Sequence, residues 1–64
     1  MDLEGMKVLG GYMEVYRVVG TVELSMTRFD GEWMHLVTLD TPKEVDGRLL
    51  TRIVLEDNEI LETN

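Results

Sequence analysis

The feature that most constrains this chain is a hairpin signal within Val22–Leu39. Two runs of alternating apolar and polar residues flank Asp30-Gly31, and such a pair adopts the positive φ values of a tight turn. With these two residues as the loop, one face of the hairpin carries mainly apolar cross-strand pairs and is expected to face the core. These pairs are Val22 with Leu39, Leu24 with Val37, Met26 with His35, and Arg28 with Trp33.

The opposite face of the expected hairpin is polar at its open end and apolar near the turn. Phe29, Met34 and Leu36 lie on this face, while Trp33 and Arg28 pair close to the turn on the first one. Because Trp, Arg, Phe and Met are enriched in the cores of interfaces, these five side chains are the candidate protein interface. The alternative is that both faces are core, with the far end covered by residues 1–11.

Residues 12–19 favour a strand, since they are rich in β-branched and aromatic types. Their apolar side chains fall on both parities, so this strand needs cover on both faces. Gly20 interrupts an otherwise continuous extended run, which indicates a bend, a bulge or a close approach of another backbone. Gly5, Gly10 and Gly11 suggest a loose N-terminal segment over residues 1–11.

The region after the hairpin has two interpretations. Thr41-Pro42-Lys43-Glu44 has the form of a helix start and predicts a short helical turn near 42–46 that ends at Gly47. The β-branched residues of 48–56 then favour a strand. The alternative is a helix over 42–56, because apolar residues there also recur at helical spacing. A tight turn at Asp57-Asn58 would fold 59–62 back against 48–56.

Together these elements predict a mostly all-β chain of four to five strands, arranged as a small antiparallel meander or a half-open SH3/OB-like barrel. The alternative fold is α+β, a β-sheet followed by a C-terminal helix over 42–56. The likeness to small barrels is one of architecture alone and implies no activity. Residues 1–64 are expected to form a single small β domain.

The small size of the chain calls for a further source of stability. A chain of 64 residues buries a limited core, which disulfides, a structural metal or self-association commonly supplement. The chain has no Cys and one His, so neither disulfides nor a structural zinc site fits the sequence. Self-association remains, and a homodimer is the favoured form.

The sequence predicts no catalytic, metal or cofactor-binding residue, and we expect the protein not to be an enzyme. His35 has no Cys to activate, and no nucleophile-elbow pattern surrounds the hydroxyls, so it is expected to be a structural residue at the margin of the core. The acidic run from Glu56 to Glu62 lacks the spacing of a calcium loop, and no glycine-rich phosphate loop is present. No small-molecule substrate is expected either.

The charge balance limits the classes of partner. Thirteen Asp and Glu against six Lys and Arg give a net charge of −7, which disfavours direct contact with nucleic acid or an anionic membrane. No apolar run is long enough for a signal segment or a membrane span, so a cytoplasmic location is expected. The sequence therefore predicts a small acidic non-enzymatic interaction module that binds a second copy or another protein. The alternative is an acidic DNA-mimic-type inhibitor of a nucleic-acid-binding protein.

Overall fold

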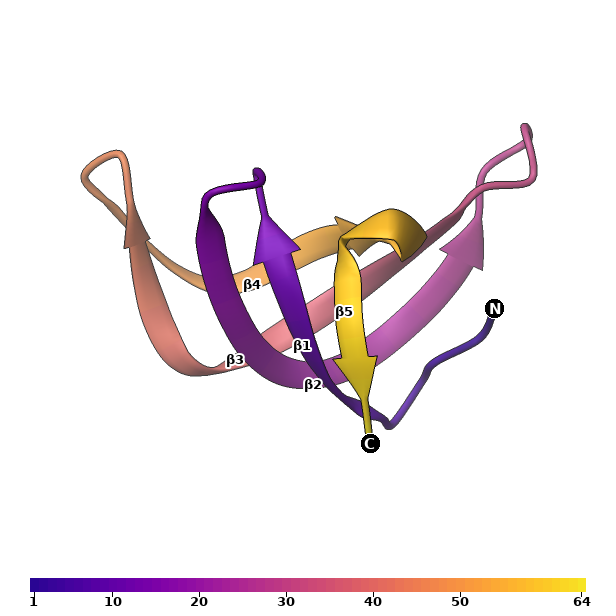
Figure 1. Cartoon of the computed structure of the whole chain (residues 1–64), viewed down its shortest axis with the longest axis horizontal. Coiled ribbons are helices and arrows are strands. Elements are labelled where there is room, and N and C mark those ends of the chain that lie inside the picture. The colour runs from indigo at the N-terminus through magenta and orange to yellow at the C-terminus, as the bar shows by residue number, and fades with distance from the viewer.

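Strands make up most of this protein, as a computed structural model of residues 1–64 shows (Figure 1). They form one five-stranded antiparallel sheet in the order β4-β3-β2-β1-β5. The prediction of a small all-β antiparallel fold is therefore confirmed. The strands are β1 (Lys7–Tyr12), β2 (Tyr16–Thr27), β3 (Trp33–Val45), β4 (Arg48–Glu56) and β5 (Ile60–Thr63), with a 3-10 turn, η1 (Asp57–Glu59), before β5.

The sheet curls because its two longest strands, β2 and β3, bend along their length (Figure 1). The curl brings β1 next to β4 in the interior, where a Cβ on Gly10 would collide with the side chain of Leu55. No ladder of hydrogen bonds joins β4 to β1 or β5, so the sheet stays open. The result is half of a small barrel rather than a closed one.

Gly20 lies in the middle of β2, close against the backbone of β3. A Cβ at this position would clash with the backbone oxygen of Thr38 and lie 2.7 Å from Cγ1 of Val37. Of the three options that the sequence leaves open at Gly20, a bend, a bulge or a close backbone approach, the structure shows the close approach, and β2 continues through Gly20 without a break.

The core lies on the concave side of the curled sheet. Its buried apolar residues come from every strand except β5 and from the N-terminal segment: Leu3, Val8, Val18, Val22, Val37, Leu39, Ile53 and Leu55. His35 is the one charged or polar residue with a fully buried side chain in this region, at 0% exposure. The core is small, as the length of the chain predicts.

The register predicted for the central hairpin is wrong by one residue. Thr27 is the last residue of β2 to pair, opposite Trp33, so the loop holds residues 28–32 rather than Asp30 and Gly31 alone. Within it Gly31 has φ +89° and donates its N–H to the carbonyl of Arg28 at 2.9 Å. As a result Met26 lies opposite Met34, and His35 lies opposite Ser25.

A β-bulge at Glu23 causes the second departure from the predicted pairing. Val22 pairs with Val37 and Leu24 with Leu36, so Glu23 is an extra residue on β2. An extra residue reverses the in-and-out alternation of the side chains that follow it. Val22 is therefore buried as predicted, whereas Leu24 and Met26, predicted inward, are 42% and 45% exposed.

The predicted helical turn near 42–46 and the alternative helix over 42–56 are both wrong. Residues 42–45 belong to β3, and a two-residue turn at Asp46-Gly47 joins β3 directly to β4. Both turn residues have positive φ, 51° and 77°, as a type I′ hairpin requires. Pro42 is tolerated because the ladder between β3 and β4 is irregular between Thr38 and Lys43.

The two ends of the chain also differ from their predictions. Residues 60–63 do fold back, but they pair with β1 instead of 48–56, because η1 carries the chain across to the other edge of the sheet. The segment 1–11, expected to be loose, contains β1, and Leu3 is buried in the core.

Candidate functional site

An apolar patch covers the outer, convex face of the sheet where β2, β3 and β4 lie side by side. Leu24, Leu36 and Val54 form one row across the three strands, and Met26 and Met34 form the next. Leu24, Met26 and Val54 are each between 42% and 48% exposed, while Met34 and Leu36 are half-buried. We call these five residues the outer patch. Part of its exposure arises from the bulge at Glu23, which turns Leu24 and Met26 outward.

Two ion pairs lie at opposite ends of the outer patch. Arg28 Nη2 lies 2.8 Å from Glu56 Oε2, beside the row of methionines, and Arg52 Nε lies 3.3 Å from Glu23 Oε1, beside the row of Leu24. Each pair is neutral overall. Without these four residues the chain still has eleven acidic and four basic side chains, so the whole net charge of −7 lies elsewhere. The outer patch thus has an Arg–Glu ion pair at each of two ends, with Asp30 as an additional acid 3.6 Å from Arg28 Nε.

The five predicted interface residues do not form one surface. Met34 and Leu36 belong to the outer patch, and Arg28 lies at its edge in the ion pair with Glu56. Phe29 is fully exposed in the loop between β2 and β3. Trp33 is stacked on His35, with ring centroids 6.4 Å apart and an interplanar angle of 6°, and so lies toward the interior. Sequence reasoning missed Leu24, Met26 and Val54 as members of the exposed surface.

A chain of hydrogen bonds crosses the interior through the buried His35. Nδ1 of His35 lies 2.7 Å from Oγ of Ser25 on β2, and its Nε2 lies 2.6 Å from Oδ1 of Asp57 on η1. The N–H of Leu3 donates to the same Ser25 oxygen at 3.0 Å. The wrong register hid this arrangement from the sequence, because it placed Met26 rather than Ser25 opposite His35.

Ser25, His35 and Asp57 are the residue types of a hydrolytic triad, but their environment differs from that of a reactive site. The side chain of His35 has no contact with solvent, and none of the surface hollows is lined by it or by Ser25. The Ser25 oxygen already accepts a hydrogen bond from Leu3. A nucleophile needs access to substrate and nearby donors for the developing oxyanion. The arrangement in this structure therefore links segments of the fold.

The hydrogen bond from His35 lowers the pKa of the Asp57 carboxyl below its ordinary value. The positive charge of the Met1 amino group, 3.6 Å from the Asp57 carboxylate, acts in the same direction, while partial desolvation opposes both. Asp57 thus stays ionised in the folded protein and accepts the hydrogen bond from the ring.

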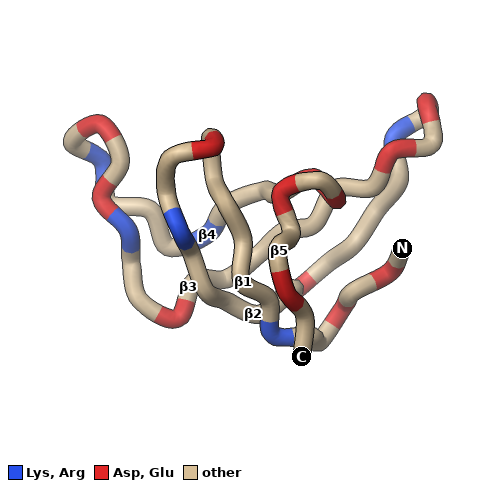
Figure 2. The backbone as a smooth tube through the Cα atoms, in the orientation of Figure 1, with Lys and Arg blue, Asp and Glu red and all other residues tan.

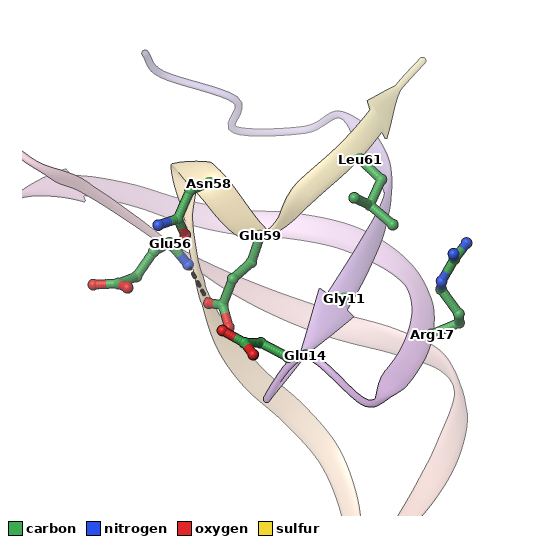
Figure 3. A pocket seen from close by; sticks show the side chains of 7 residues that line it. All are labelled: Gly11, Glu14, Arg17, Glu56, Asn58, Glu59 and Leu61. Atoms are coloured by element: carbon green, nitrogen blue, oxygen red, sulfur yellow. Dashed lines mark hydrogen bonds between the residues drawn. The ribbon is translucent and has the colours of Figure 1, made fainter.

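The largest hollow of the surface lies between the β1–β2 turn, η1 and β5 (Figure 3). It has a volume of about 430 Å³, and its lining includes Glu14, Arg17, Asn58 and Glu59. Glu59 is engaged with the backbone, since its carboxylate accepts the N–H of Glu56 at 2.8 Å. No group of three His, Asp or Glu side chains is placed to hold a metal ion.

The acidic residues are concentrated at turns and in the terminal segments (Figure 2). A protein that imitates DNA needs carboxylates in two rows at about the spacing of phosphates along the duplex. In Figure 2 the acidic positions are spread over separate turns and segments of the backbone. This distribution gives no support to the alternative of a DNA mimic.

Comparison with known proteins finds no match: no family model, no curated protein and no solved structure is detectably similar to this chain. Among the elements of the structure there is no helix with the length and apolar character needed to cross a membrane.

Proposed function

We propose that this protein is a small non-enzymatic protein–protein interaction module that self-associates as a dimer, with the outer patch as its interface. The observation that carries the proposal is that Leu24, Met26 and Val54 are exposed side by side. An Arg–Glu ion pair lies at each of two ends of this surface. Contiguous exposed apolar surface bordered by polar residues is typical of interfaces. Burial of this area against a partner supplies the free energy of binding.

A second copy is the partner that the charges favour. Two molecules that each carry seven net negative charges repel one another least when they meet through a face whose carboxylates are paired with arginines. Glu23 and Glu56 at this face are already paired with Arg52 and Arg28, which leaves less negative charge there to attract a basic partner. A dimer would also supplement the small core, which neither disulfides nor a zinc site can do in this chain. A cytoplasmic location stays a prediction of the sequence.

Sedimentation at micromolar concentration tests the proposal with a matched pair of variants. Met34→Glu adds a charge in the middle of the outer patch, and Val15→Glu adds the same charge at a site 76% exposed in the turn between β1 and β2. We expect a dimer for the wild type and Val15→Glu, and a folded monomer for Met34→Glu. A monomeric wild type would contradict the proposal, as would equal dissociation of the two variants.

Phe29 requires a separate variant because it lies fully exposed in the loop between β2 and β3 and is not one of the five residues of the outer patch. Phe29→Ala is expected to leave the dimer unchanged if the interface is confined to the five residues of the outer patch. Weaker self-association of Phe29→Ala would instead extend the interface to the loop, as the sequence prediction has it.

A further inference from the structure

Residues 1–6, which we call the N-terminal strap, are held by a few contacts to β2. The N–H of Gly5 donates to the carbonyl of Val22 at 2.8 Å, and the N–H of Val22 donates to the carbonyl of Met6 at 2.9 Å. The remaining bonds involve Ser25: its Oγ accepts the N–H of Leu3, and its N–H donates to Glu4. Ser25 therefore connects the N-terminal strap to the buried hydrogen bonds of His35.

The positions of the protons in this chain follow from its acceptors. An ionised carboxylate only accepts hydrogen bonds, so Nε2 of His35 carries a hydrogen and donates it to Asp57. In the neutral ring Nδ1 then holds a lone pair, which accepts the hydroxyl hydrogen of Ser25. The Ser25 oxygen in turn accepts the N–H of Leu3. Each donor in this series has an acceptor, and the hydrogen bonds all point the same way, from Leu3 through Ser25 and His35 to Asp57.

We infer that the Ser25, His35 and Asp57 chain is an acid-operated latch, in which the proton on Asp57 controls whether the N-terminal strap stays docked on β2. Protonation adds one hydrogen to an oxygen of the Asp57 carboxylate and so removes the only charged acceptor among Ser25, His35 and Asp57. Hydrogen bonds to a charged partner are about twice as strong as those between neutral groups. The buried ring cannot replace this partner with water, because His35 has no exposed surface.

Loss of the latch weakens the hold on Ser25 and, through it, on Leu3. The strap then leaves, which removes the Leu3 side chain from the core and exposes the backbone edge of β2 at Val22. The lowered pKa of Asp57 agrees with this direction, because a carboxyl that the fold keeps ionised stabilises the folded state until acid protonates it.

Other ionisable groups surround the latch and must be separated from it by experiment. They are the amino group of Met1 beside Asp57, Glu4 on the backbone of Ser25, Glu56 paired with Arg28, and Glu59 bonded to the backbone of Glu56. Whichever ring nitrogens carry hydrogen, Nε2 of His35 donates to the Asp57 carboxylate, so the latch is assigned to the loss of that charged acceptor. Glu4 is the one other carboxylate in direct contact with the latch, through the backbone of Ser25.

Nuclear magnetic resonance of the whole chain during an acid titration tests the latch. The readouts are the heteronuclear relaxation of residues 2–6 and the exchange protection of the Gly5 amide, compared with amides of β1. In the wild type we expect the strap to be as ordered as β1 at neutral pH and to lose order in acid while β1 remains protected. Asp57→Asn removes the titrating group and is expected to abolish this acid step. Asp46→Asn is the control, since Asp46 has no ion pair or side-chain hydrogen bond and lies in the β3–β4 turn.

Ser25→Ala tests the connection between the strap and the ring at neutral pH. Loss of the bond from Leu3 is expected to lower the protection of the Gly5 amide by about tenfold, the effect of one hydrogen bond, with β1 unchanged. If the order of the strap is unchanged in Ser25→Ala, the latch is refuted. If Asp57→Asn still loses the order of the strap at the same pH as the wild type, the latch is also refuted, and the titration is assigned to Glu4. If Ser25→Ala unfolds entirely, the comparison of Asp57→Asn with Asp46→Asn decides alone.

Discussion

Replacing Gly20 with alanine is expected to destabilise the protein more than any other single added methyl group in the sheet. The new Cβ would clash with the backbone oxygen of Thr38 and lie 2.7 Å from Cγ1 of Val37, where ordinary contacts are 3.4–4 Å. Both obstacles are in β3, and a backbone carbonyl cannot rotate away as a side chain can. Relief therefore requires β2 and β3 to separate at the point where the sheet bends.

The expected cost of Gly20→Ala is about 2 kcal/mol, within the range for overpacking of a well-packed interior. For a domain of this size that cost lowers the melting temperature by about 8–16 °C. Thermal and urea unfolding followed by circular dichroism measure both values, at one protein concentration because the proposed dimer would make the midpoint depend on it.

Two other glycines in β1 provide a graded control for this prediction. A Cβ on Gly11 would have its nearest neighbour, Cδ1 of Leu61, at an ordinary 3.9 Å, so Gly11→Ala is expected to change stability by less than about 0.5 kcal/mol. Gly10→Ala would meet the end of the Leu55 side chain and should fall between the two, since a side chain yields more readily than a backbone. If Gly20→Ala is as stable as Gly11→Ala, the close approach of β2 and β3 is refuted.

Two further predictions concern the N-terminal strap and its latch. Leu3→Ala should lower the free energy of unfolding by about 2 kcal/mol or more, because Leu3 is 5% exposed. Leu49→Ala, at a side chain that is 67% exposed, should change the urea midpoint little. Equal effects of the two variants would contradict the docking of the strap. Because the hydrogen bond from His35 lowers the pKa of Asp57, its stabilisation is present above the ordinary carboxyl pKa and is lost as pH falls through the lowered one. The difference in stability between wild type and Asp57→Asn should therefore shrink in acid, and a difference that grows there would refute this sign.

Much of the fold could be predicted because binary patterning and β-branched residues point to strands over most of the chain. The inward face of β3 was predicted correctly for His35, Val37 and Leu39, since alternation along a single strand needs no partner. The pairing between strands was harder to predict from the sequence. The sequence contains Asp-Gly twice, and the tight type I′ turn forms at Asp46-Gly47 rather than at Asp30-Gly31.

The errors share a physical cause, which is that tertiary contacts decide between locally similar options. Thr41-Pro42 satisfies the local rules for a helix start, yet pairing with β4 keeps this segment extended. Residues 60–63 suit either edge of the sheet, and the 3-10 turn directs them to β1. The bulge at Glu23 leaves no local signal, because the polar residue fits an outward position in either register.

That bulge has the largest effect on the candidate sites. It turns Leu24 and Met26 outward to complete the outer patch, and it brings Ser25 inward to His35. Neither the full outer patch nor the latch could be derived from a hairpin in regular register. The sequence predicted an isolated His35 on the inward face and Met34 on the opposite face, but it did not predict their neighbours on β2.

The pairing of β2 with β3 supports both sites, and nuclear Overhauser contacts of the His35 ring test it most directly. The structure predicts contacts from the ring to the β-hydrogens of Ser25 and to the ring of Trp33. Contacts from the ring to the methyl group of Met26, with none to Ser25, would show the regular register and contradict the outer patch and the latch together.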